Sequence, residues 1–164
     1  MENNDIELKL IKWMTEFIEV PNPLLGNWVP CPFARQARVN NNISIKFASI
    51  AELTHTVRES VKLLESKEVV VVCFNHNDIN PVELQEYVEG MNKTLVLENY
   101  VILEDHPHTP EYINGVCMNF GYCGLLVIQK LDKLNKASDQ LREKGYYNHW
   151  TKEDLDSVVS WRYK

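Results

Sequence analysis

The chain has 164 residues, of which 45% are apolar and 24% are charged, a composition typical of a globular protein with a buried core. Its formal net charge of −6 and its scattered Lys and Arg residues argue against a large nucleic-acid surface. No apolar run approaches the roughly 18 residues of a membrane span, and the polar, acidic N-terminus argues against an ordinary signal peptide.

Apolar residues at helical spacing predict an amphipathic helix over residues 5–20, which Pro21 and Pro23 end. The segment 21–42 that follows has no long periodic pattern. Apolar and polar residues then alternate over 43–47, which indicates a half-buried strand.

An apolar stripe over residues 53–64 predicts a second helix. The continuous β-branched run over 69–74 is typical of a central strand covered on both faces. Asn80-Pro81-Val82-Glu83 is a favourable helix start, with a capping Asn, a Pro in the first turn and a Glu three residues after the cap. We expect this helix to continue to Leu95.

The remaining elements include two further strands, at 100–103 and 125–128, separated by an irregular segment over 105–122. A helix is marked by apolar residues over 134–141, and a capping-box pattern predicts a short final helix within 151–159.

Strands that alternate with helices imply right-handed crossovers. We therefore predict a single α/β domain over residues 1–164, with about four strands in a largely parallel or mixed sheet flanked by helices. A ferredoxin-like α+β arrangement is the alternative.

The four cysteines, Cys31, Cys73, Cys117 and Cys123, contain no C-x-x-C pair. Cys73 lies in the run that reads as a buried strand. A reducing, cytoplasmic setting is therefore expected, and a Cys117–Cys123 disulfide is left open.

The segment around Cys31-Pro32-Phe33-Ala34 is the first candidate site. Proline favours the first turn of a helix, so Cys31 is expected at or beside a helix N-terminus, where a thiolate or another anion is stabilised. Arg35 and Arg38 would hold an anionic group. The alternative is a small buried cysteine with two solvated arginines.

The segment from Glu104 to His108 is the second candidate. It follows a predicted strand, where α/β proteins often bind ligands. Glu104, His106 and His108 share one side of an extended chain and together have the ligand types of an open iron site. An acid–base role for His106 or His108 and a loop-capping role are the alternatives.

Both irregular segments are long and rich in aromatic residues, a composition typical of ordered, functional loops. Tyr112, Asn114 and Tyr122 could line a ligand pocket there, or simply pack the loop down.

Two resemblances bear on the Cys31 segment. Cys31-Pro32-Phe33-Ala34 with Arg35 and Arg38 resembles the active-site entry of omega-class glutathione transferases and related glutaredoxin-like proteins, which implies a redox or glutathione-linked cysteine. More broadly, Trp13, the Cys-Pro-Phe-Ala segment, the strand–helix–strand core and His106-Pro107 are similar to a small bacterial family that is described only as a domain of unknown function.

These patterns favour a small enzyme that acts on a low-molecular-weight substrate between the loops 26–38 and 104–122. Cys31 would be the nucleophile or the thiolate ligand of a metal or haem, and His106 or His108 would carry protons or bind a metal. The cofactor stays open, with iron or haem as candidates because a Cys-Pro pair is frequent in haem-regulatory motifs. A non-catalytic metal-binding, haem-binding or interaction protein and a thiol-redox protein are the alternatives. We expect a small-molecule ligand, no nucleic acid and no membrane, and leave a homodimer open.

Overall fold

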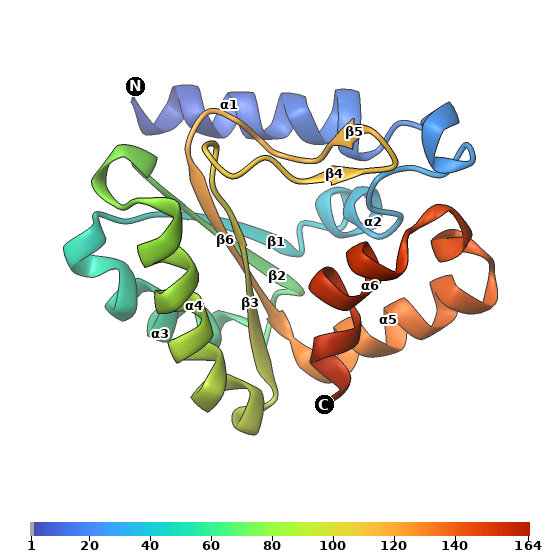
Figure 1. The fold of residues 1–164 in the computed structure, drawn as a ribbon. Helices are drawn as coiled ribbons and strands as arrows, with labels where there is room; N and C mark the ends of the chain where they lie inside the picture. Colours follow the sequence, from blue (N-terminus) through green and yellow to red (C-terminus); the bar gives the residue numbers. More distant parts are fainter. Residues whose placement is uncertain (1) are drawn as a thin grey trace.

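The computed structural model describes residues 2–164 (Figure 1). Its centre is a four-stranded sheet with the strand order β1-β2-β6-β3. These strands are β1 (Ile43–Phe47), β2 (Val69–Phe74), β6 (Gly124–Lys130) and β3 (Tyr100–Asp105).

The direction of the strands decides where the loops gather. β1 and β2 are parallel, whereas β6 lies antiparallel between β2 and β3. β1, β2 and β3 therefore run in the same direction, and their carboxyl ends lie at one edge of the sheet together with the start of β6. The predicted single-domain α/β fold with a mixed sheet is confirmed. The strand–helix order differs from the β-α-β-β-α-β order of the ferredoxin-like alternative.

Two helices, α3 (Leu53–Leu63) and α4 (Pro81–Leu95), cover one face of the sheet (Figure 1). The side chains of alternate strand residues meet their apolar stripes, and this contact forms the larger core. It contains Leu53, Val57, Leu64, Val70, Val72, Phe74, Leu84, Val88, Leu95, Ile102, Leu126 and Ile128. The predicted capping box at the start of α4 is confirmed, because the Asn80 side chain accepts from the Glu83 N–H and the Glu83 side chain accepts from the Asn80 N–H.

The first helix packs on the opposite face. α1 (Asn3–Trp13) continues as a π-helical turn over Met14–Ile18, so the helix predicted over 5–20 is confirmed in outline. Leu10 packs with the strand residues that point to this side, among them Val71 and Cys73. The β1 residues predicted to face a core, Ile43, Ile45 and Phe47, pack on this cluster.

The two segments predicted to be irregular contain short ordered elements. The first holds α2 (Ala34–Val39), and the second holds a hairpin of β4 (Tyr112–Ile113) and β5 (Val116–Cys117). The hairpin turns at Asn114 and Gly115, whose φ angles of 48° and 82° suit a two-residue primed turn. Leu25, Ile113 and Val116 form a small core between the two segments.

The C-terminal part is helical, with α5 (Leu131–Glu143) and α6 (Lys152–Val158). The predicted cap of the final helix is confirmed, because the Thr151 hydroxyl accepts from the Asp154 N–H. Short 3-10 turns occupy Pro23–Leu25, Ile50–Glu52, His76–Asp78, Val96–Glu98, Tyr146–His149 and Ser160–Tyr163. Within residues 2–164, none of the helices has the length and apolar character needed to cross a bilayer.

Candidate functional site

The connections at the carboxyl ends of β1, β2 and β3 surround one edge of the sheet (Figure 1). In α/β proteins this is the edge at which ligands usually bind. The connection from β3 to β6, residues 106–123, is the longest of them. Two cavities open around it.

Asn119 organises this long connection. Its amide nitrogen donates to the Asp105 carboxylate and to the carbonyl oxygens of His106 and Thr109, at 2.8 to 3.2 Å. Its oxygen accepts from the Glu111 N–H, and Asp105 also accepts from the Phe120 N–H at 2.9 Å. The connection is therefore fixed by side-chain hydrogen bonds although it contains little regular structure.

His106 helps to fix the loops and is not free to act as an acid, a base or a ligand. Its Nε2–H lies 2.9 Å from the Ile79 oxygen and 3.2 Å from the His76 oxygen, and its Nδ1 accepts from the His108 N–H at 3.0 Å. Both ring nitrogens are occupied, and the residue is buried. Of the alternatives weighed from the sequence, the loop-capping role matches this geometry. The predicted catalytic and metal-binding roles of His106 do not.

Three imidazoles meet at this point, because His76 at the end of β2 lies against His106 and the exposed His108. Their ring centroids are 5.1 to 5.8 Å apart. The Nδ1 of His76 is buried without a hydrogen-bond partner. Burial, and then the other two imidazoles, lower the pKa of His76, which keeps its ring neutral at pH 7.

The predicted metal set is not assembled. Over the described residues 2–164, no group of three His, Cys, Asp or Glu side chains is placed to hold a metal ion. Glu104, His106 and His108 are included in that result. The expectation that the three share one ligand-binding side fails because His106 turns inward to the carbonyl groups of the β2–α4 connection.

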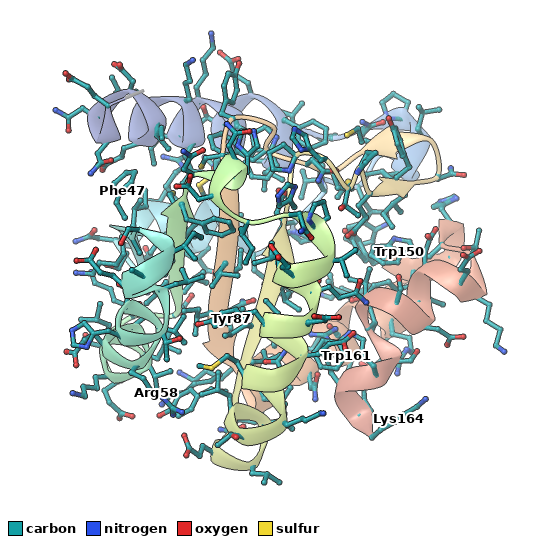
Figure 2. The ribbon with its side chains drawn as sticks, turned by 60° about the vertical axis from the view of Figure 1, so that its left-hand side comes forward. Phe47, Arg58, Tyr87, Trp150, Trp161 and Lys164 are labelled. Atoms are coloured by element: carbon teal, nitrogen blue, oxygen red, sulfur yellow. The ribbon has the colours of Figure 1, made fainter. Side chains whose placement is uncertain are left out.

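The larger cavity, about 1090 Å³ in volume, lies along β3, the edge strand. α4 forms one wall, the loop after β3 forms a second, and the C-terminal segment with Trp161 and Lys164 forms a third. Figure 2 shows Trp161 on the side of the C-terminal segment that faces α4. Most α/β proteins bind small molecules in clefts of this order of size.

The outer edge of β3 is partly closed by Asn92 of α4. Its side chain donates to the Ile102 carbonyl oxygen at 3.0 Å and accepts from the Ile102 N–H at 2.9 Å, so it takes the place of a neighbouring strand. Backbone groups alternate in direction along a strand. The N–H and C=O of Glu104, two residues on, therefore also point away from β6, along the cavity wall.

Among the titratable groups that line this cavity, Glu104 has the clearest pKa shift. Its burial and the nearby carboxylates of Glu89 and Glu111 raise its pKa to about 7. The residue as a whole is exposed, so its carboxyl group is within reach of a solute in the cavity. Burial also raises the pKa values of Glu111 and Asp105. Such shifts concentrate at sites where carboxyl groups exchange protons with ligands.

The second cavity, about 600 Å³, lies at the ends of β1 and β2 under α1. Figure 2 labels Phe47, which lies on its wall at the end of β1. Cys73 and Cys123 line the cavity together with His76 and Tyr122. The thiols of the two cysteines lie close enough for each to shift the pKa of the other. The disulfide considered from the sequence, Cys117–Cys123, is not formed, because all four cysteines are free thiols.

Cys31 lies in neither of these cavities. It precedes Phe33, the N-cap residue of α2, by two positions, so it is close to the helix start but not at it. The Ala34 N–H donates to the Cys31 carbonyl oxygen at 3.3 Å, and the backbone N–H groups of Phe33 and Ala34 act to lower the pKa of the thiol. Part of the residue is exposed, yet the loss of water around the sulfur, together with the Glu19 carboxylate, raises the pKa of its thiol. That direction is opposite to the thiolate stabilisation predicted from the sequence.

Arg38 already has an anionic partner within the chain. Its guanidinium binds both oxygens of Glu19 at 2.8 Å, where the π-helical turn ends. The hydrogen bond from Arg38 lowers the pKa of Glu19. Arg38 was predicted to bind an anionic substrate group, and the structure corrects this to an internal ion pair. Arg35 is exposed beside it.

The predicted pocket residues of the second loop are dispersed. Tyr112 is exposed on β4, and Asn114 forms the hairpin turn while its amide donates to the Leu24 oxygen. Tyr122 alone of the three lines one of the two cavities, with Lys9 lying 4.3 Å from its ring centroid. The two irregular segments meet at Leu24 and Leu25, which contact the hairpin outside the predicted site loop 26–38. Cys31 lines neither of the two cavities, whereas His106 lines the larger one.

No protein-family model matches this chain, and it has no match among curated proteins or solved structures. The resemblances noted for the Cys31 segment therefore stay predictions. Function has to be argued from the residues of the two cavities.

Proposed function

We propose that this protein binds a low-molecular-weight substrate in the cavity along β3 and that Glu104 exchanges a proton with it. The observation that carries the proposal is the position of Glu104 in the wall of a cavity of about 1090 Å³ that Glu89 and Glu111 also line. The proposal retains two predictions from the sequence, an enzyme that acts on a small molecule and a site at the loop 104–122. It replaces Cys31 and the histidines with Glu104.

The pKa of Glu104, about 7, supports a role in general acid–base chemistry. A carboxyl group that is protonated in part of the molecules at neutral pH can both donate and accept a proton, and a pKa near the working pH gives the most efficient transfer. The protein's reaction class would then be a proton transfer to or from a group of the substrate.

The charges of the wall are mixed, because Lys93, Arg162 and Lys164 line the cavity together with Glu89, Glu104 and Glu111. Beside Glu104 itself, the carboxylates of Glu89 and Glu111 favour a neutral or cationic group over an anion. The outward N–H and C=O of Glu104 offer one donor and one acceptor beside that carboxyl group. An amide, amine or amidine group matches both features. We retain the cytoplasm as the proposed location, where free thiols stay reduced.

The first test measures the titration of Glu104 by ¹³C NMR of side-chain carboxyl groups. We expect a midpoint close to 7 in the wild-type protein. In Glu89→Gln the midpoint should fall, because a neighbouring negative charge is removed. Glu98→Gln makes the same change on an exposed residue after α4 and should leave the midpoint unchanged. A wild-type midpoint near 4 would refute the acid–base role.

The second test asks what the cavity binds. Benzamidine, a cation, and benzoate, an anion of similar shape, are titrated into ¹⁵N-labelled protein. We expect benzamidine to shift the amide signals of α4 and residues 102–111, and benzoate to leave them in place. Glu104→Gln should weaken benzamidine binding by about tenfold, the effect of losing one charge-assisted hydrogen bond worth about 1.4 kcal/mol. Equal shifts with both probes would contradict the proposed selectivity.

A further inference from the structure

The sheet brings together two cysteines from distant parts of the chain. Cys73 lies in β2, and Cys123 immediately precedes β6. Because Cys73 pairs with Leu125, Cys123 lies diagonally across from it, and both point to the α1 face, where they pack with Leu10 and Phe120. The two side chains belong to the same buried cluster and line the same cavity, and each thiol shifts the pKa of the other. Both residues are almost fully buried, with exposed fractions of 1% and 2%.

The backbone around Cys123 is suited to a change in its position. Cys123 lies in a bend outside the regular strand, with Gly121 and Gly124 on either side of Tyr122-Cys123. Gly121 has a φ of 86°, a conformation that glycine adopts at low cost. A disulfide needs its Cβ atoms about 3.5 to 4.5 Å apart, closer than most diagonal pairs in a sheet. Cys123, in the bend, is the residue that can make this approach, because Cys73 is held in a strand that is paired on both sides.

The cavity of about 600 Å³ reaches both cysteines from the carboxyl ends of β1 and β2. The entrance is polar, with Ser49, Asn75 and Asn77 among its lining residues. The low exposure of the two sulfurs excludes a bulky disulfide or a protein partner from direct attack. A molecule of the size of hydrogen peroxide fits the space.

We propose that Cys73 and Cys123 form a reversible disulfide when a hydroperoxide enters this cavity, which makes the pair a redox site distinct from the cavity along β3. In the first step the Cys123 thiolate attacks one oxygen of hydrogen peroxide. An S–O bond forms, the O–O bond breaks, hydroxide leaves, and Cys123 becomes a sulfenic acid. In the second step the Cys73 sulfur attacks the Cys123 sulfur. The S–S bond forms, the S–O bond breaks, and the Cys73 proton leaves with the hydroxide as water.

The interaction between the two thiols supports this order of steps. It lowers the pKa of Cys123, and the Phe74 N–H acts in the same direction, whereas burial and Asp105 oppose it. The same interaction, with burial, raises the pKa of Cys73. Of the two thiols, Cys123 therefore loses its proton more readily, which makes it the nucleophile of the first step. Reduction by a dithiol such as dithiothreitol restores both thiols through thiol–disulfide exchange.

The experiment treats the full-length protein with hydrogen peroxide, unfolds it, and labels the remaining thiols with N-ethylmaleimide. The reduced protein carries four cysteines and should gain four labels. After oxidation we expect two labels, a mass lower by two hydrogens before labelling, and a Cys73–Cys123 bridge in peptide mapping. Dithiothreitol should restore four labels. A protein that keeps four labels, or is oxidised first at Cys31 or Cys117, would overturn the proposal.

Two sets of variants separate this pair from ordinary thiol oxidation. Cys31→Ser and Cys117→Ser should each still form the bridge at the wild-type rate. Cys73→Ser should stop at the Cys123 sulfenic acid, which dimedone traps when it is present as the oxidised protein is unfolded, and Cys123→Ser should block both steps. Peptide mapping of the wild-type protein decides the question by itself if either core variant fails to fold. Oxidation should proceed equally in Glu104→Gln, so the outcome does not depend on the proposed function of the other cavity.

Discussion

Replacement of Asn92 by alanine tests whether the Asn92 side chain stabilises the free edge of β3, which lines the larger cavity. Asn92 is nearly buried, and its amide group makes two hydrogen bonds of 3.0 and 2.9 Å to the backbone of Ile102. Asn92→Ala removes both and leaves the N–H and C=O of Ile102 without partners. A buried polar group that loses its partner costs about 1–3 kcal/mol.

Water in the adjacent cavity can recover part of that cost, so the two groups together should lower the free energy of unfolding by about 2–4 kcal/mol. Urea unfolding followed by circular dichroism measures the change, with the m-value showing whether the exposed surface stays the same. Asn92→Asp keeps the acceptor for the Ile102 N–H but loses the donor, and it should fall between alanine and wild type.

Gln85→Ala is the matched control, because Gln85 is an exposed residue of the same helix that bonds only to Glu89. It should change the free energy of unfolding by less than about 0.5 kcal/mol. If Asn92→Ala is as stable as Gln85→Ala, the hydrogen bonds to Ile102 contribute nothing net, and the account of the β3 edge is wrong. A stable but self-associating Asn92→Ala would show instead that Asn92 protects the open strand edge.

Three further changes test the packing and charges of the fold. Gly124→Ala places a Cβ against the ring of Phe74 and should lower the free energy of unfolding by about 1–3 kcal/mol. Gly90→Ala, in a helix with open space around it, should raise that free energy by up to about 1 kcal/mol, and urea unfolding measures both changes. Arg38→Gln should destabilise the protein at pH 7, because the ion pair that lowers the pKa of Glu19 is lost. The difference in stability from wild type should disappear as the pH falls below about 4, because Glu19 is then protonated and the ion pair no longer forms in either protein. His106→Ala should cost about 2–4 kcal/mol and leave zinc binding, measured by calorimetry, the same as in wild type, since this ring serves the loops and not a metal.

Much of the fold follows from local patterns in the sequence. The alternation over 43–47, the β-branched run over 69–74 and the capping box at Asn80 each fix an element within a few residues, and each is present in the structure. The insertion of β6 between β2 and β3 could not be predicted in this way. The order of the strands depends on which of them pair, and the spacing of residues within one strand does not determine its partners.

The candidate sites were predicted less well, because their residues meet only through the sheet. Nothing in the spacing of Cys73 and Cys123 indicates contact, which follows from the register of β2 with β6. His106 has the sequence appearance of a ligand, but its role depends on carbonyl groups of a different connection. Asn92 did leave a signal, since it is a polar residue on the buried stripe of α4 between Val88 and Leu95.

Both proposed sites depend on the direction of β6. Had β6 been parallel, its start would lie at the opposite edge of the sheet, and Cys123 could not reach the end of β2. Because β6 is antiparallel to β3, the connection between them, residues 106–123, lies at the end of the sheet where β1, β2 and β3 finish. Its first residues then close the cavity that holds Glu104, and its last residues close the cavity that holds the cysteine pair. Asn119 and Asp105 hold that connection in place, so a single loop positions both sites.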